Sequence, residues 1–292
     1  LVESITVDSL IIIDDGLLSE INIHIYRLNS YSPEQLKIQI DPSVHDVVVA
    51  STQWELPCKE FDDLWESLVF NDEIKNEVFS TKNTNFMDIL WVIFHIFDND
   101  LKVSGPPGMG KTSLCKALAQ KLSIHLNDRY KKCLFVEINS HSLFSKWFSE
   151  SGKLVQKMFD QIEEMAEIDR FLVIVLIDEI ESLCMSRSEI LNKNEPTDSL
   201  RVVNAVLTQI DRIRMFRNVF IFTTSNIRQS LDMAFIDRTD ICRFIGQPTA
   251  EAIYSILASC IFEMQRVKFY LFYFICSFIS LCIKIFQWKI LI

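Results

Sequence analysis

The chain has 292 residues, of which 49% are hydrophobic and 23% are charged. This length fits one large domain or two ordinary ones, and the composition is too apolar for a disordered chain. The net charge is −10 and there is no basic run, which argues against direct binding of nucleic acid. None of the eight cysteines forms a C-x-x-C pair, which favours reduced core thiols over a zinc or redox site.

Residues 1–80 are predicted to form a small domain of mixed α and β type. Three segments have strand patterns: DSLIIID, SEINIHIYRL and VHDVVVASTQWELP. The segment KEFDDLWESLVF predicts an amphipathic helix, because its apolar residues share one helical face: Phe61, Leu64, Trp65 and Leu68. No residues here have catalytic spacing, so a domain that docks a substrate or an adaptor and a plain structural subdomain both remain open.

Residues 81–104 join this region to the next one and have an unusual composition. The dense apolar run FMDILWVIFHIF is followed by the polar segment DNDLKVS. Such a polar segment does not fit the centre of a parallel sheet, where strands are buried on both faces. Either Leu101 and Val103 make a short strand or a segment has been replaced, and we treat residues 81–104 as an aberrant linker.

Helix and strand patterns alternate from residue 105 to about residue 262. The predicted strands are CLFVEIN, FLVIVLIDE and NVFIFTTSN. The predicted helices are KTSLCKALAQKLSIHL, SGKLVQKMFDQIEEMAE and DSLRVVNAVLTQID. This alternation predicts an α/β fold in which helices flank a parallel sheet.

The segment GPPGMGKTS matches the phosphate-loop pattern G-x-x-x-x-G-K-[ST]. Its glycines allow backbone N–H groups to surround phosphate oxygens, and the N-terminus of the following helix favours an anion. We expect Lys111 to contact the β- and γ-phosphates and Thr112 to bind Mg²⁺. The predicted cofactor-binding residues are Gly105, Pro106, Pro107, Gly108, Met109, Gly110, Lys111, Thr112, Ser113 and Asp178.

Two acidic residues, Asp178 and Glu179, end the apolar strand segment FLVIVLI. Carboxylates at the carboxyl end of a buried strand lie at the sheet edge where ligands bind. Asp178 is expected to hold Mg²⁺ and Glu179 to polarise the attacking water, which argues for hydrolysis rather than binding alone. Asn226 ends the next strand and is expected to place its amide near the γ-phosphate.

Arg238 lies twelve residues beyond Asn226, and two interpretations of it remain open. An arginine here is able to reach the γ-phosphate in a neighbouring subunit and accelerate hydrolysis as a finger in trans. Alternatively, it is a surface arginine paired with Asp237 or Asp240. The sequence does not decide between these two interpretations.

The segment HSLFSKWFSES places Lys146, Trp147 and Phe148 in a polar loop between a strand and a helix. Exposed aromatic side chains are unfavourable unless they contact something. A core position is the ordinary interpretation. The place of the loop beside the sheet also makes a grip on a polypeptide plausible, so these three residues are a predicted substrate-binding loop.

Taken in this order, the motifs resemble those of the AAA+ ATPases, and more closely those of the pachytene checkpoint protein 2 (thyroid receptor-interacting AAA+ ATPase) family. The resemblance is strong over residues 105–262 and weaker over residues 1–78, notably in QWELP and FDDLWESLVF. It implies an AAA+ P-loop sheet preceded by a small α+β N-terminal domain, with ATP and Mg²⁺ as cofactors and a homo-hexameric ring as the assembly.

The resemblance also implies a function. The family uses ATP to remodel HORMA-domain proteins, often with a HORMA-like adaptor, in spindle-checkpoint silencing and in meiotic control of chromosome axes and recombination. The expected location is the nucleus, the chromosomes and the cytoplasm. By position, the site residues match Walker A (Lys111, Thr112), Walker B (Asp178, Glu179), sensor 1 (Asn226), the first pore loop (Trp147) and the region of the trans arginine finger (Arg238).

Residues 263–292 depart from the family. A helical lid carrying a sensor 2 arginine is expected to be largely missing, and we expect the chain to be truncated at both ends. The apolar tail is interpreted either as a membrane anchor or as a false translation product. Weak ATP binding and slow turnover are therefore expected. Alternatives to a motor are a nucleotide-gated HORMA-binding module, an inactive truncated product and a membrane-tethered ATPase.

Overall fold

The computed structural model describes residues 6–7, 23–24, 26–39, 47–69, 100–140, 151–182, 196–226, 233–239 and 241–266. The chain divides into two compact units, residues 1–68 with 76–247 and residues 69–75 with 248–292. In the second unit the structure describes helix α10 (Ala250–Arg266). Thr249 caps this helix, because its Oγ1 accepts a hydrogen bond from the Ala252 N–H at 3.2 Å.

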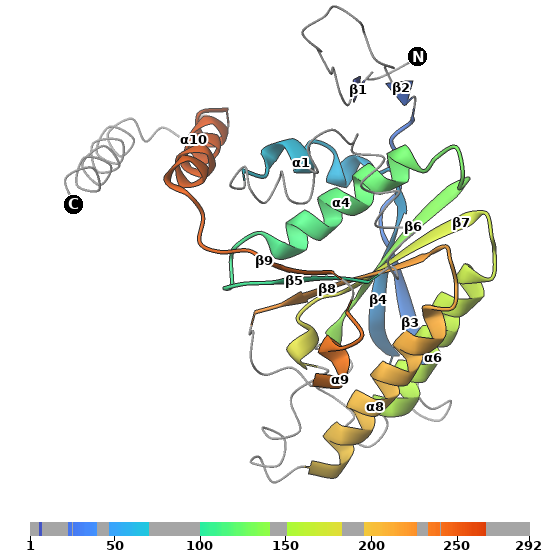
Figure 1. Cartoon of the computed structure of the whole chain (residues 1–292). Helices are drawn as coiled ribbons and strands as arrows, with labels where there is room; N and C mark the ends of the chain where they lie inside the picture. Colours follow the sequence, from blue (N-terminus) through green and yellow to red (C-terminus); the bar gives the residue numbers. More distant parts are fainter. Residues whose placement is uncertain are drawn as a thin grey trace, which may run out of the picture. The chain divides into compact units, whose positions relative to one another are not determined.

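The first unit is built around a seven-stranded sheet with the order β3-β4-β6-β7-β8-β5-β9 (Figure 1). Strands β6, β7, β8, β5 and β9 run parallel, and β3 and β4 add an antiparallel pair beside β6. The strands are β3 (Glu34–Gln39), β4 (Val47–Leu56), β5 (Asp100–Ser104), β6 (Lys132–Ile138), β7 (Phe171–Ile177), β8 (Val219–Ser225) and β9 (Ile241–Phe244). A separate antiparallel pair joins β1 (Thr6–Val7) to β2 (Ile23–His24).

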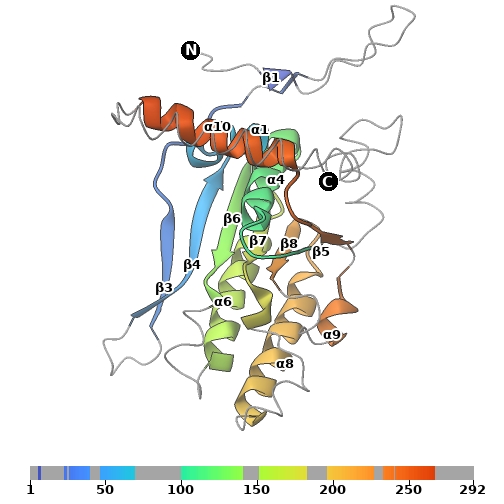
Figure 2. The same cartoon turned by 90° about the vertical axis from the view of Figure 1, so that its left-hand side faces the viewer.

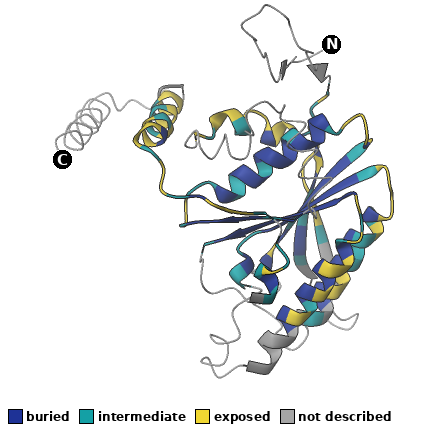
Figure 3. Ribbon diagram, viewed as in Figure 1, coloured by how far each residue is buried: buried dark blue, intermediate teal, exposed yellow. Residues whose placement is uncertain are grey.

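Helices cover both faces of the sheet. Helix α4 (Lys111–His125) lies on one side, and α6 (Ser151–Ala166) and α8 (Pro196–Ile213) lie together on the other (Figures 1 and 2). Six of the seven residues of β7 are buried, as its continuous apolar run predicts. Buried residues of the sheet, α6 and α8 form one hydrophobic cluster, and Figure 3 colours the buried residues of these elements dark blue. The predicted α/β fold, with its three core strands and three helices, is confirmed.

The N-terminal region contributes directly to this sheet. The predicted strand ending in Pro57 is β4, which pairs with β6 from Ser51 opposite Ile138 to Leu56 opposite Cys133. Strand β3 was not predicted from the sequence. Most of the segments DSLIIID and SEINIHIYRL lies outside the described residues.

The single amphipathic helix predicted for residues 59–70 is wrong. The structure has a 3-10 turn, η1 (Lys59–Phe61), and a four-residue helix, α1 (Leu64–Ser67). Between them Asp63 has a left-handed backbone, with φ of 56°, which ends one turn before the other begins. Phe61 is buried as predicted, whereas Leu64 is only half-buried.

A second correction concerns the end of the predicted linker. Residues 100–104 form β5, which lies between β8 and β9 and runs parallel to both. The short-strand alternative is therefore confirmed, and the expectation that this polar segment does not fit the sheet is wrong. Lys102 is only 3% exposed, and its Nζ lies 5.9 Å from the centroid of the Phe235 ring. Asp100 is also buried, and its Oδ2 lies 3.1 Å from Arg214 Nε.

Residues that follow β4 pack against α4. The Cys58 N–H donates to Gln120 Oε1 at 3.0 Å, and Gln120 Nε2 donates to the Cys58 carbonyl at 2.9 Å. Beside this contact, the rings of Trp54, Phe61 and Phe135 pack with centroids 5.6–5.7 Å apart. Two buried hydrogen bonds and an aromatic cluster therefore join the N-terminal segment to the helix that follows the phosphate loop.

The described cysteines are free. Cys58, Cys115 and Cys133 are buried, and burial raises the pKa of each thiol, as expected for core cysteines. Cys242 and Cys260 are exposed. Within the part of the chain that the structure describes, no helix has the length and apolarity needed to cross a membrane. The predicted tail beyond residue 266 lies outside that part.

Candidate nucleotide site

The predicted phosphate loop connects β5 to α4. Gly105, Gly108 and Gly110 have φ values of 157°, 77° and 78°, which L side chains rarely adopt. A Cβ at Gly105 would lie 2.2 Å from the Ile245 carbonyl oxygen, and the Gly105 N–H donates to the Ser225 carbonyl at 3.1 Å. The start of the loop is thus held between the end of β8 and the chain that follows β9.

Lys111 lies across this loop. Its Nζ donates to the carbonyls of Gly105 at 3.0 Å and Pro106 at 2.7 Å. Burial lowers the pKa of Lys111, and three nearby carboxylates oppose that shift, Glu181 most strongly and then Asp178 and Glu179. The ammonium group is therefore close to both the loop and the acidic residues that follow β7.

Asp178 meets Thr112 at the carboxyl end of β7. Thr112 Oγ1 donates to Asp178 Oδ1 at 2.9 Å, and the Thr224 hydroxyl donates to the same oxygen. The Ser140 hydroxyl donates to the Asp178 carbonyl at 2.8 Å. A carboxylate and a threonine hydroxyl in contact form a hard oxygen pair of the kind that Mg²⁺ prefers, so these residues fit the predicted metal.

Glu179 and Asn226 also meet. Asn226 Nδ2 donates to Glu179 Oε1 at 3.2 Å, across the ends of the neighbouring strands β7 and β8. Glu179 has a left-handed backbone, with φ of 53°, and its N–H donates to Thr224 Oγ1 at 3.0 Å. This strained turn fixes the two residues that were predicted to act on the attacking water.

Glu181 and Thr224 also lie at this edge of the sheet and were not predicted as site residues. Glu181 Oε1 accepts a hydrogen bond from the Asn226 N–H at 2.9 Å, and Thr224 binds both Asp178 and Glu179. Their signal was their spacing: Glu181 stands two residues after Glu179, and Thr224 two residues before Asn226. Both residues therefore belong to the same group at the sheet edge.

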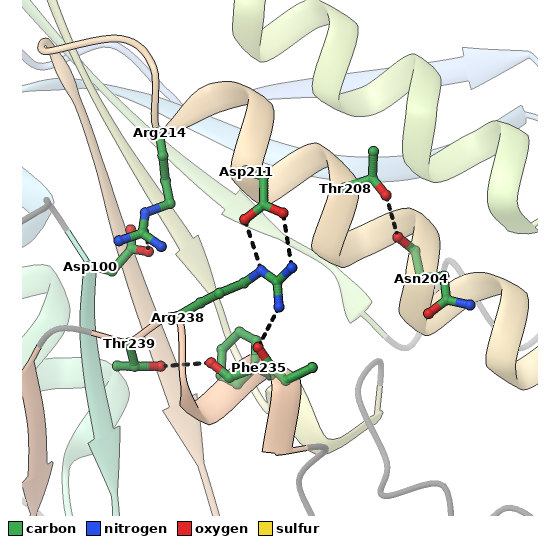
Figure 4. Close-up of polar contacts among 9 residues, drawn as sticks. Asp100, Asn204, Thr208, Asp211, Arg214, Phe235, Arg238 and Thr239 are labelled. Carbon is green, nitrogen blue, oxygen red and sulfur yellow. Dashed lines mark hydrogen bonds and ion pairs between the residues drawn. The ribbon is translucent and has the colours of Figure 1, made fainter.

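The side chain of Arg238 points toward Asp211 on α8 (Figure 4). Its Nε and Nη2 donate to the two carboxylate oxygens of Asp211 on α8, at 2.8 and 3.0 Å, and its Nη1 donates to the Ala234 carbonyl at 2.6 Å. Asp211 is thus a partner of Arg238, and Asp240, one of its two predicted partners, lies outside the described residues. This contact within one chain leaves a role in a neighbouring subunit as a prediction.

The structure describes some of the remaining predicted site residues and not others. Pro107 and Gly108 are exposed, and Pro106, Met109 and Ser113 are half-buried, so the loop is open to a ligand. The predicted substrate loop, Lys146 to Phe148, lies outside the described residues.

The family model described as "ATPase family associated with various cellular activities (AAA)" matches residues 101–247. This match covers about half of the chain and contains the phosphate loop and both strand-end pairs described above. This chain belongs to the AAA family. The pattern from which the family was predicted is therefore confirmed.

Within the AAA family, pachytene checkpoint proteins are among the relatives of this chain. The chain is 47% identical over 258 residues to the human pachytene checkpoint protein 2 homolog and 46% identical over 257 residues to that of Oryza sativa subsp. indica. Each alignment covers 84% of this chain, but only 57% of the human and 52% of the rice protein.

Two solved structures share the AAA fold of this chain. Caenorhabditis elegans PCH-2 superposes with a TM-score of 0.68 at 44% identity, over 87% of this chain and 61% of that chain. The structure of an Escherichia coli MS115-1 HORMA:CdnC:Trip13 complex superposes with a TM-score of 0.56 at 20% identity, over 72% of this chain and 74% of that chain. The second likeness concerns the fold alone.

Proposed function

We propose that this chain is a magnesium-dependent ATPase of a homo-hexameric ring and that it uses hydrolysis to remodel HORMA-domain proteins. The observation that supports hydrolysis most directly is the meeting of four predicted residues at one edge of the sheet: Thr112, Asp178, Glu179 and Asn226. They occupy the carboxyl ends of β7 and β8 and the start of α4, where α/β folds bind ligands.

The binding step depends on the loop and its lysine. The ammonium group of Lys111 lies against loop carbonyls at 2.7 and 3.0 Å, and it exchanges these for β- and γ-phosphate oxygens when ATP enters. Thr112 and Asp178 are the residues that hold Mg²⁺. Bound Mg²⁺ supplies a Lewis acid that neutralises charge on the phosphate oxygens.

The hydrolytic step depends on Glu179 and Asn226. The Glu179 carboxylate orients the attacking water and accepts its proton, while the amide of Asn226 fixes that carboxylate at 3.2 Å. Thr224 holds the backbone of Glu179 and the side chain of Asp178, so the two carboxylates keep separate positions. One serves the metal and the other serves the water.

The substrate proposal has a different support. The relatives are pachytene checkpoint proteins, and a structure of the same fold is named as a complex with a HORMA protein. A ring of such chains, working with a HORMA-like adaptor in the nucleus, on chromosomes and in the cytoplasm, would act in spindle-checkpoint silencing and in meiotic control of chromosome axes and recombination. The Lys146 to Phe148 loop would grip the substrate.

Glu179→Gln tests the motor against the nucleotide-gated binding module. The full chain is assayed for single-turnover hydrolysis of labelled ATP and for release of a HORMA protein from its closed complex. The amide cannot accept the proton of water, so hydrolysis falls by about 10²–10⁴-fold and release stops, while ATP binding persists. Glu167→Gln changes an exposed glutamate in the same way and should affect neither assay.

The two assays separate the parts of the proposal. If hydrolysis in Glu179→Gln equals that of the unchanged chain, the assignment of Glu179 fails. If hydrolysis falls but HORMA release continues, pulling is excluded and the binding module replaces it.

A further inference from the structure

Glu181 lies in the candidate site but has no role in the mechanism above. It belongs to the 3-10 turn η2 (Ile180–Ser182), directly after Glu179. Ile180 is completely buried in the main core, and the Ser182 N–H donates to the Glu179 carbonyl at 2.9 Å. The turn is therefore anchored by Ile180 at its start and closed by Ser182 at its end, which fixes the backbone of Glu181 between these two residues.

The described contact of the Glu181 side chain is to the backbone of Asn226. Its Oε1 accepts the Asn226 N–H at 2.9 Å, while the side chain of the same asparagine donates to Glu179 at 3.2 Å. Its other oxygen, Oε2, is buried and has no hydrogen-bond partner among the described residues. The Glu181 carboxylate thus forms one hydrogen bond among the described residues, and its partner, Asn226, is the residue that orients Glu179.

Asn226 directly follows the last residue of β8, and the carbonyl of the same peptide unit, that of Ser225, accepts the Gly105 N–H at 3.1 Å. The ladder between β7 and β8 ends at Ile177 opposite Thr223, so it does not reach Asn226. A hydrogen bond from its N–H to a fixed carboxylate holds the backbone where the strand ends. Charge-assisted bonds of this kind are stronger than neutral ones.

We propose that Glu181 is a positioning residue for hydrolysis, which acts by holding the backbone of Asn226 so that its amide orients Glu179. This inference rests on the proposed ATPase function and adds a residue to it. Glu181 touches neither the water nor the phosphates in this role. Its effect passes through one named hydrogen bond.

The competing role is electrostatic. Glu181 is also the foremost of the carboxylates that act on Lys111, so it is placed to serve as a counterion for that lysine. A glutamine at this position separates the two roles, because its amide oxygen still accepts the Asn226 N–H but carries no charge. An alanine removes both.

The experiment uses the full chain and two readouts. Hydrogen exchange at the Asn226 amide, resolved by fragmentation in the mass spectrometer, needs neither nucleotide nor activity. Single-turnover hydrolysis is measured against ATP concentration in parallel. In Glu181→Ala, Asn226 exchanges at least about tenfold faster and the maximal hydrolysis rate falls about 10–100-fold, as loss of a hydrogen bond to a charged group predicts.

Glu181→Gln restores Asn226 protection and the hydrolysis rate to within about threefold of the unchanged chain, since the acceptor is kept. In Glu181→Ala, the ATP concentration for half-maximal rate changes little. Glu167→Ala, at an exposed position, serves as the control. Unchanged exchange at Asn226 in Glu181→Ala overturns the inference, and so does a glutamine variant as defective as alanine.

Failure of the proposed function looks different from failure of this inference. If the unchanged chain does not hydrolyse ATP, the ATPase proposal is wrong, while exchange at Asn226 still reports the hydrogen bond. If the unchanged chain hydrolyses ATP and Glu181→Ala loses Asn226 protection at full rate, Glu181 is structural and the inference is wrong.

Discussion

Arg238 holds both carboxylate oxygens of Asp211, with Nε 2.8 Å from Oδ1 and Nη2 3.0 Å from Oδ2. The pair joins the residues after α9 (Met233–Ile236) to helix α8 (Figure 4). Both side chains are substantially exposed, at 32% and 48%, so the pair contributes little to stability. The two hydrogen bonds to Asp211 instead fix the orientation of the Arg238 guanidinium group, for which a role in a neighbouring subunit was one of two predictions.

The first prediction concerns that action in trans. Arg238→Ala alone lowers ATP hydrolysis by about 10³-fold or more, as removal of an arginine finger does. Lys111→Ala is inactive because it cannot bind phosphate. Mixing the two inactive variants places an intact Arg238 beside an intact site and recovers hydrolysis. If the mixture stays as inactive as its components, Arg238 does not act between subunits.

The second prediction compares two glycines. Gly105→Ala places a methyl group 2.2 Å from the Ile245 carbonyl oxygen, so the backbone must move. We expect a loss of at least about 2 kcal/mol in the free energy of unfolding, measured in urea. Gly152, in α6, has open space around its Cβ position and no positive φ. Gly152→Ala should raise the free energy of unfolding by about 0.5 kcal/mol, and a loss there would contradict the described backbone.

The third prediction concerns Gln120, which satisfies both backbone groups of Cys58. Gln120→Leu leaves a buried N–H and a buried carbonyl without partners. Each costs about 1–3 kcal/mol, so we expect the free energy of unfolding to fall by about 2–6 kcal/mol. Gln156→Leu, at an exposed site on α6, should stay within about 0.5 kcal/mol of the unchanged chain. Equal losses in the free energy of unfolding for Gln120→Leu and Gln156→Leu would show that the hydrogen bonds between Gln120 and Cys58 do not stabilise the fold.

The fourth prediction is a dependence of stability on pH. Burial lowers the pKa of Lys102, while Cys242 and Glu181 act in the opposite direction. The unfolded chain therefore binds more protons than the folded chain between this lowered pKa and the ordinary value of about 10.4. In that window stability rises with pH, because the unfavourable charge is lost.

Comparison with Lys102→Met isolates this effect. The free energy of unfolding of the unchanged chain, minus that of Lys102→Met, should increase with pH by at most about 1.4 kcal/mol per pH unit. Lys131→Met, at an exposed position, controls for loss of one positive charge. A difference that stays constant up to pH of about 10 would show that Lys102 is not desolvated in the folded state.

The sequence predicted the central strands well because their apolar runs are local signals. Strand β7 is the unbroken segment FLVIVLI, and its burial follows from composition alone. Strand β5 was misjudged because its charged residues are compensated from far away: Asp100 by Arg214, and Lys102 by the ring of Phe235. Partners more than one hundred residues apart leave no periodic signal.

In the candidate site, too, the residues with a local sequence signal were predicted and those that depend on distant contacts were not. Thr112, Asp178, Glu179 and Asn226 follow fixed spacings from a loop and two strand ends, and the structure brings them together in the expected pairs. Glu181 was passed over because a glutamate after a strand is commonly solvated. Only the fold shows that its carboxylate accepts the Asn226 N–H. The helix predicted for residues 59–70 failed for a backbone reason, the left-handed conformation of Asp63.

Strand β4 protects one edge of the parallel sheet of the AAA region. By pairing with β6 from Ser51 to Leu56, it occupies backbone groups that would otherwise form an open rim of the sheet. The neighbouring side chains on β6 include Leu134 and Val136, both buried. Trimming the chain to the phosphate loop and the parts that follow would uncover this edge of β6 and favour edge-to-edge strand pairing between molecules. The N-terminal segment thus prevents aggregation through the edge of β6, in addition to packing against α4.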